Sequence, residues 1–136
     1  MISSQPSEGT LLDAQMAATM TSLVLDEFSR RIISSSVTHG RTVEEICEEQ
    51  DIPLSTCYRR IKRLVDGGAM IVERIVVASS GRKYAVYRSK FSRLEIRLEN
   101  GRVSAYGTLN PAIADGLRKT RAFARDETDY SPQLWG

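Results

Sequence analysis

The chain has 136 residues, of which 41% are hydrophobic and 26% charged, with a formal net charge of +2. These values are ordinary for a globular protein and suit one domain with short extensions. No apolar run approaches the ~18 residues that a membrane-spanning helix needs, and the N-terminus lacks the basic start and apolar stretch of a secretory signal. Two cysteines, Cys47 and Cys57, are too few for a disulfide scaffold, so we expect a reduced, cytoplasmic protein.

Charge is distributed unevenly along the chain. Residues 56–93 hold ten Lys or Arg and two acids, Asp66 and Glu73, which gives +8. The rest of the chain holds nine bases and fifteen acids, which gives −6. A charge run is more often a solvated face than a binding site. A basic block between acidic flanks is nevertheless typical of a local nucleic-acid-binding face, so its place in the fold decides between the two interpretations.

The N-terminal third predicts helices. We expect residues 1–9 to form a disordered leader and Thr10 to cap a first helix. Apolar residues then recur at steps of four, which predicts one buried helical face: Leu12, Met16, Met20, Val24, Phe28 and Ile32. The stretch 10–38 forms one helix or two, and a break near Thr21-Ser22 is favoured because Thr and Ser are poor in helix interiors and good as caps. His39-Gly40 would end the last helix.

Two helices separated by a tight turn are predicted next. Thr42-Val-Glu-Glu45 is a capping box, so a short helix begins there and ends near Gln50. Residues 51–53 form the turn. Ser55 is expected to cap a second helix that runs to Asp66, where two glycines end it.

The pattern then becomes extended. Residues 70–78 are rich in Val and Ile and predict a strand, 79–82 a turn, and 83–88 the returning strand. Leu94, Ile96 and Leu98 alternate with charged residues before Asn100-Gly101, a strong hairpin signal, and 103–106 would be the return strand. Asn110-Pro111 predicts the start of a last helix that extends to about residue 125.

The helix from Ser55 to Asp66 has two different faces. At 100° per residue, Cys57, Ile61, Leu64 and Val65 share one side, which would pack against the preceding helices. Ser55, Arg59, Lys62 and Arg63 lie on or beside the opposite side, with Thr56 and Tyr58 flanking.

A helix of this kind can enter a DNA major groove about 12 Å wide. The N-terminal residues of such a helix usually read bases, which favours Ser55, Thr56, Tyr58 and Arg59. Lys62 and Arg63 suit phosphates. At the turn of the first hairpin, Arg82 and Lys83 would contact the backbone or the adjacent minor groove.

Much of the chain resembles the ArsR-like winged-helix transcription regulators, above all their archaeal members, in the run TVEEICEEQDIPLSTCYRRIKRLVDGGAMIVER. LDEFSRRII resembles the helix that precedes this motif, and YAVYRSKFSRLEIRLENGRV resembles the wing strand and the extra hairpin that often follows it. The resemblance covers about residues 25–103 and implies DNA binding. Asp51 stands where many such turns carry Gly, although Asp tolerates the left-handed conformation.

The expected fold is therefore α+β: a winged helix-turn-helix with an additional C-terminal β-hairpin and terminal helices. We assign residues 10–107 to that domain, 108–125 to a C-terminal helix that dimerises the chain together with the first helix, and 126–136 to a flexible tail. The expected function is sequence-specific binding of double-stranded DNA by a homodimer that regulates transcription.

Other functions are weighed against this one. A winged helix that docks a protein without reading DNA is the main alternative, and RNA binding is a third. Metal sensors in the resembled family carry a Cys-x-Cys pair or a His and Asp set on the last helix, and neither pattern is present, so no metal, cofactor or small-molecule effector is expected. Cys47 and Cys57 are expected to be core residues, with a redox disulfide as the alternative. No catalytic set is recognisable, so we do not expect an enzyme.

Overall fold

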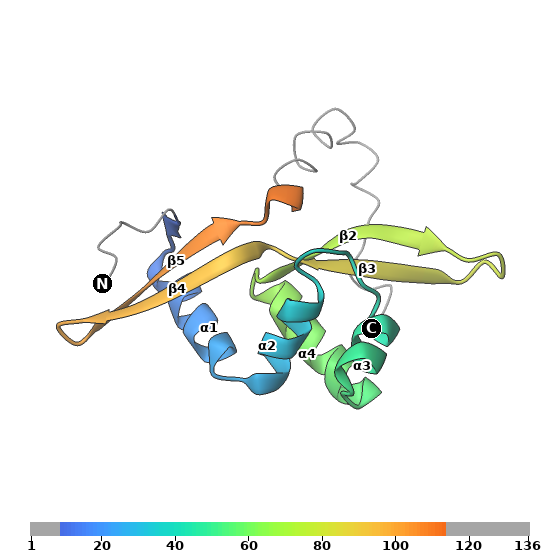
Figure 1. The fold of residues 1–136 in the computed structure, drawn as a ribbon, viewed down its shortest axis with the longest axis horizontal. Coiled ribbons are helices and arrows are strands. Elements are labelled where there is room, and N and C mark those ends of the chain that lie inside the picture. The colour runs from blue at the N-terminus through green and yellow to red at the C-terminus, as the bar shows by residue number, and fades with distance from the viewer. Residues whose placement is uncertain (1–8, 114–136) are drawn as a thin grey trace.

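The computed structural model describes residues 9–113, which form a mixed α+β fold (Figure 1). In chain order the elements are β1 (Thr10–Leu11), α1 (Ala14–Val24), α2 (Glu27–Ser35), α3 (Val43–Gln50), α4 (Leu54–Asp66), β2 (Met70–Val77), β3 (Lys83–Ser89), β4 (Phe91–Glu99) and β5 (Arg102–Leu109). Residues 1–8 of the expected leader, the C-terminal helix beyond its first turn and the tail lie outside the described residues.

Two antiparallel sheets run end to end along one side of the helices. β2 and β3 form the first sheet, and the second has the order β1-β5-β4. Figure 1 shows the β2–β3 hairpin extending past α3 and the β4–β5 hairpin extending past α1 in the opposite direction. Both predicted hairpins are confirmed. Positive φ angles at Gly81, and at Asn100 and Gly101, allow the two tight turns.

The core lies between the helices and the ribbon of strands. Tyr87 on β3 is fully buried and packs in one cluster with buried residues from every helix, among them Met20, Ile32, Ile46 and Ile61. Half-buried Leu94 and Ile96 of β4 pack against the same cluster. The second hairpin is therefore part of the same core as the helices and the first hairpin.

The start of the chain differs from the prediction at Thr10. Thr10 does not cap a helix, because Thr10–Leu11 is a short strand that pairs with Gly107 and Tyr106 of β5. Asp13 caps α1 instead, and its carboxylate accepts a hydrogen bond from the backbone N–H of Met16 at 2.8 Å. Pairing with a strand almost a hundred residues away overrides the local capping signal.

The N-terminal stretch contains two helices, as favoured, but the predicted break was wrong. The break lies at Leu25-Asp26 and not at Thr21-Ser22, since the hydroxyl of Thr21 donates to a carbonyl one turn earlier at 2.7 Å. Asp26 starts α2 by accepting from the backbone N–H and the hydroxyl of Ser29 at 2.8 and 2.7 Å. α2 ends at Ser35, so His39-Gly40 lies in the following loop and does not end the helix.

The capping box that starts α3 is confirmed. Thr42 Oγ1 accepts from the backbone N–H of Glu45 at 3.2 Å, and the Glu45 carboxylate accepts from the backbone N–H of Thr42 at 2.8 Å. Asp51 ends α3 in the left-handed conformation, with φ of 53°. The predicted cap of α4 was wrong: Pro53 occupies the cap position without a side-chain hydrogen bond, and Ser55 lies inside the first turn.

An ion pair joins β2 and β3 to the loop after α2. Arg88 Nη1 lies 2.6 Å from the Glu73 carboxylate, and the guanidinium also donates to the carbonyls of Val37 and Thr38. The register of β2 against β3 shifts between Val72 and Arg74, at the position of Glu73. The side chain of Arg88 is only 14% exposed, so these partners are needed to offset the free-energy cost of burying its charge.

The two predicted caps of α3 and α4 can be compared by stability. Thr42→Ala should lower the free energy of unfolding by ~1 kcal/mol, because it removes the capping hydrogen bond of α3. Ser55→Ala should lower it by less than ~0.5 kcal/mol, because Ser55 caps nothing. Urea denaturation followed by circular dichroism measures both values. Equal losses would show that the sequence-based assignment of Ser55 as a cap was correct.

Arg88 and Arg74 both pair with Glu73 and provide a second test. Arg88→Ala should lower the free energy of unfolding by roughly 2–3 kcal/mol, since it removes a 2.6 Å ion pair from a half-buried carboxylate and a charged donor from two loop carbonyls. Arg74→Ala should cost less than ~1 kcal/mol, because Arg74 is 61% exposed. The same denaturation experiment compares them. If Arg74→Ala lowered the free energy of unfolding as much as Arg88→Ala, the contacts of Arg88 would not be what holds the loop to β2 and β3.

Candidate nucleic-acid interface

α4 separates into a buried and an exposed face, as its sequence predicts. Cys57, Ile61 and Leu64 are buried, and Val65 is half-buried. The opposite face carries four exposed residues: Ser55, Arg59, Lys62 and Arg63. Thr56 and Tyr58, at its margins, are half-buried. We call the four exposed residues the outer row of α4.

Two of the bases in the outer row have no acidic partner in the described part of the chain. Within residues 9–113, neither Arg59 nor Arg63 makes an ion pair. Lys62 lies 3.6 Å from Asp66 one turn further along, with both side chains more than 60% exposed. An ion pair this exposed contributes little to stability, and another anion can readily replace Asp66 as the partner of Lys62. The outer row thus presents cationic groups to solvent.

Arg60 was missed by the sequence reasoning. It lies 3.2 Å from the Asp26 carboxylate at the start of α2, and its guanidinium is 5.9 Å from the ring centroid of Phe28. Its place in the sequence, one residue and about 100° round the helix from Arg59, puts it beside the outer row. The acid that holds it comes from another helix, so the sequence alone does not reveal the pair.

Glu44 of α3 joins the start of α4 to the wing tip, which we define as residues 79–83. One carboxylate oxygen of Glu44 lies 3.4 Å from the Tyr58 hydroxyl, which donates to it, and 4.0 Å from the Arg82 guanidinium. Burial, and then the negative charge of Glu44, raise the pKa of Tyr58, so its hydroxyl stays protonated. The structure therefore brings Tyr58 and Arg82 together around an acid that was not among the expected site residues.

The wing tip is a tight turn that presents bases to solvent. Gly81 has φ of 89° and its N–H donates to the carbonyl of Ala78 at 2.8 Å. The guanidinium of Arg82 lies over the ring of Tyr84, 5.0 Å from its centroid, and Lys83 is exposed. Stacking on Tyr84 limits where Arg82 can point.

The cysteines behave as core residues. Both are free thiols, and Cys57 is fully buried against the carbonyl of Val43. Burial, together with Cys47 and Glu44, raises the pKa of Cys57 to about 12, so its thiolate is scarce at neutral pH. In the part of the chain that the structure describes, no group of three or more His, Cys, Asp or Glu could hold a metal ion.

Comparison with known proteins adds no family to this description. No protein-family model matches the chain, and no curated protein matches it. Among the described residues, no helix is both long and apolar enough to cross a membrane. The function has to be argued from the surface itself.

The two cysteines should differ in reactivity. At pH 8 about one Cys57 thiol in ten thousand is ionised, given a pKa of about 12. Half-buried Cys47 should therefore react with iodoacetamide well before Cys57 in the folded protein, and both should react alike in denaturant. Peptide mass spectrometry over time measures the two rates. Rapid labelling of Cys57 without unfolding would contradict the burial that the structure gives it.

Proposed function

We propose that the chain is a winged helix-turn-helix protein that binds double-stranded DNA in a sequence-specific manner and regulates transcription. The outer row of α4 is the observation that carries the proposal. It is a row of hydrogen-bonding and cationic side chains on a helix whose other side is held in the core. A helix that enters the major groove needs this combination. The α+β architecture, with a hairpin directly after α4, is compatible with a winged helix.

Each residue of the proposed interface has a distinct role. Arg59, unpaired among residues 9–113 and near the start of α4, would read a base edge, with Ser55 and Thr56 beside it. Lys62 and Arg63, further along the helix, would contact phosphates. Tyr58 is turned toward Glu44, which suits a side chain that supports the interface more than one that reads a base.

The hairpin after α4 would act as the wing. Arg82 and Lys83 at its tip would contact the backbone or the minor groove beside the site that α4 reads. Exposure of both side chains supports this role.

The proposal includes a cytoplasmic homodimer. Two copies related by a twofold axis would read half-sites about 34–36 Å apart. We propose that α1 and residues 111–125 form the dimer surface. Of the second segment the structure describes only the first turn, where Asn110 Oδ1 accepts from the backbone N–H of Ala112 at 3.1 Å.

Binding of a protein in place of DNA is a second candidate, and one observation favours it. Glu44 of α3 lies 4.0 Å from Arg82, and the same helix exposes Glu45, Glu48 and Glu49. Acids repel phosphates, whereas a protein partner can use them. Arg82 and Glu44 are 65% and 43% exposed, however, so their contact is weak and easily exchanged.

Selection of bound sequences from a random DNA pool, at a stated salt concentration, tests the proposal directly. The wild-type chain should enrich a defined, palindromic motif. Arg59→Ala should lose roughly 1–3 kcal/mol of discrimination at one base pair of that motif. Lys62→Ala should weaken binding to all sequences alike. It should also reduce the slope of the logarithm of the binding constant against the logarithm of the salt concentration by about 0.9.

Arg102→Ala is the matched control for the two variants. It removes the same charge from an exposed position on β5, far from α4 in the chain, and should leave affinity and specificity unchanged. If no motif is enriched, or if all three variants bind like wild type, α4 is not a DNA-reading helix and the protein-binding candidate gains support.

A further inference from the structure

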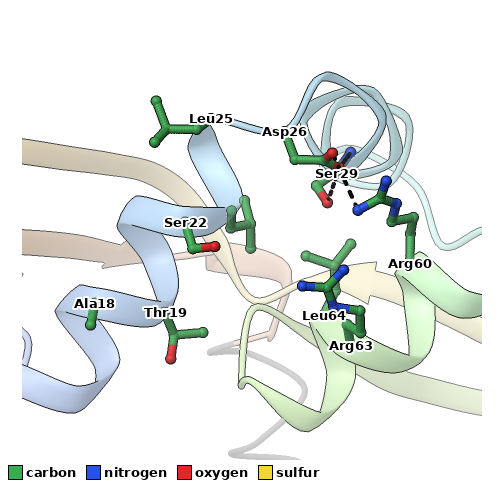
Figure 2. Close-up of a pocket in the computed structure, with 10 residues that line it drawn as sticks. Ala18, Thr19, Ser22, Leu25, Asp26, Ser29, Arg60, Arg63 and Leu64 are labelled. Atoms are coloured by element: carbon green, nitrogen blue, oxygen red, sulfur yellow. Dashed lines mark hydrogen bonds and ion pairs between the residues drawn. The ribbon is translucent and has the colours of Figure 1, made fainter.

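A cavity of about 660 Å³ lies between α1, the start of α2 and the side of α4 (Figure 2). α1 lines it with Thr19 and Ser22, α2 with Asp26, and α4 with Arg60 and Arg63. In Figure 2 the hydroxyl of Ser22 faces the space between α1 and α4, and the guanidinium of Arg63 reaches into that space from the other side. Of the residues given a role in DNA binding above, Arg63 also lines this cavity.

The charges in the cavity are not balanced. Asp26 accepts two hydrogen bonds from Ser29, which together with the nearby arginines lower the pKa of its carboxyl, so it is ionised at neutral pH. Arg60 neutralises this carboxylate at 3.2 Å. Arg63 has no ion pair within residues 9–113, so the cavity retains one positive charge.

The remaining walls are apolar or carry a hydroxyl. Buried Leu23 and Leu64 form the inner wall, and Leu25, which is 78% exposed, stands at the rim. The hydroxyl of Thr19 donates to the carbonyl of Gln15 at 3.1 Å, whereas the hydroxyl of Ser22 has no hydrogen bond to any described residue. A cationic group, a hydroxyl donor and an apolar wall therefore face the same space.

We propose that this cavity binds a small organic anion, with a carboxylate or phosphate group held by Arg63 and a short apolar body against Leu23 and Leu64. A guanidinium donates paired hydrogen bonds to the oxygens of either anionic group, and Ser22 adds a third donor. Small-molecule sites are usually clefts of a few hundred cubic ångströms in which a few polar groups orient the ligand against apolar walls. This cavity has that size and an apolar inner wall, but six of its ten lining residues are polar or charged, which suits an anionic ligand. The negative charge of the ligand would pair with the positive charge of Arg63, which no carboxylate in the cavity neutralises.

Such a ligand would be an effector if α4 binds DNA, a consequence that rests on the function proposed above. Arg63 belongs to the outer row, so a ligand that holds its guanidinium in the cavity withdraws it from DNA. The effect would be reciprocal, since ligand and DNA would each weaken the binding of the other by the same factor.

Titration of the full-length, ¹⁵N-labelled chain tests the site without DNA. The probes are hexanoate and inorganic phosphate, each at constant ionic strength, with the backbone and arginine side-chain signals followed by NMR. We expect the NMR chemical shifts of Ser22, Arg60 and Arg63 to change, and the change to saturate, with at least one probe. Binding of hexanoate alone assigns the anionic group as a carboxylate, and binding of phosphate alone assigns it as a phosphate.

Two variants should change the affinity in opposite directions. Arg63→Gln should lower the affinity for the probe by about tenfold or more, because it removes a charged donor. Asp26→Asn should strengthen binding several-fold, because it removes the carboxylate that occupies Arg60. Asn caps a helix about as well as Asp, so α2 should persist, as circular dichroism would verify.

Controls matched in charge separate the cavity from a general attraction to a basic protein. Arg102→Gln carries the same charge change as Arg63→Gln, and Asp13→Asn alters the cap of α1 as Asp26→Asn alters that of α2. Both controls should bind the probe like wild type. The proposal is overturned if neither probe saturates, or if Arg63→Gln and Arg102→Gln behave alike.

A DNA-binding assay in the presence of the bound probe examines the regulatory step. Saturating probe should lower the affinity of the wild-type chain for its motif and leave that of Arg63→Gln unchanged. Because the titration contains no DNA, failure of the ligand site and failure of DNA binding are separate results. A role of Arg63 in DNA binding without any probe binding would also overturn the ligand site.

Discussion

The loop between α2 and α3 is hydrogen-bonded along one edge of β3, and the rest of the structure depends on this contact. Arg41 and Tyr87 exchange both backbone hydrogen bonds, at 2.9 and 2.7 Å, and the N–H of Ser89 donates to the carbonyl of Ser36 at 3.0 Å. Between these bonds Arg88 holds the carbonyls of Val37 and Thr38. Since α3 begins directly after this loop, the contact fixes β3, and with it the β2–β3 hairpin, relative to α3 and α4.

The same junction also positions the second hairpin. Lys90, between β3 and β4, donates its N–H to the carbonyl of Ala69 after α4 and accepts from the N–H of Asn110 after β5. The side chain of Asn110 is buried and donates to the carbonyls of Val37 and Ser89 at 2.9 and 3.0 Å. One short segment thus holds the ends of both hairpins, which explains why two separate sheets share one core.

The sequence predicts best those features whose cause is local. The capping box at Thr42 and the hairpin turn at Asn100-Gly101 each depend on a few neighbouring residues, and both are present. One error arises where a distant residue decides, because Thr10 pairs with Gly107. The other arises where two local signals compete: the break between the first two helices follows from the cap that Asp26 forms with Ser29 and not from the poor helix formers before it.

The same distinction applies to the candidate site. The exposed and buried faces of α4 follow from the helical period, so the outer row was predictable residue by residue. The partners of its flanking residues were not, because Asp26 and Glu44 reach Arg60 and Tyr58 from other helices. Only the packing of three helices shows which cations are neutralised and which remain available.

Glu44 illustrates how an acid can sit within a cationic surface without cancelling it. Its carboxylate lies between Tyr58 and Arg82, at 3.4 and 4.0 Å, and is partly exposed to water. An exposed pair of this length is worth about 0–1 kcal/mol, less than a charge-assisted bond from the same guanidinium to a phosphate would contribute. The contact brings the guanidinium of Arg82 near the start of α4, and a phosphate offered to that guanidinium would displace Glu44 at small cost. The acid therefore leaves Arg82 available for the phosphate contact that the proposed function requires.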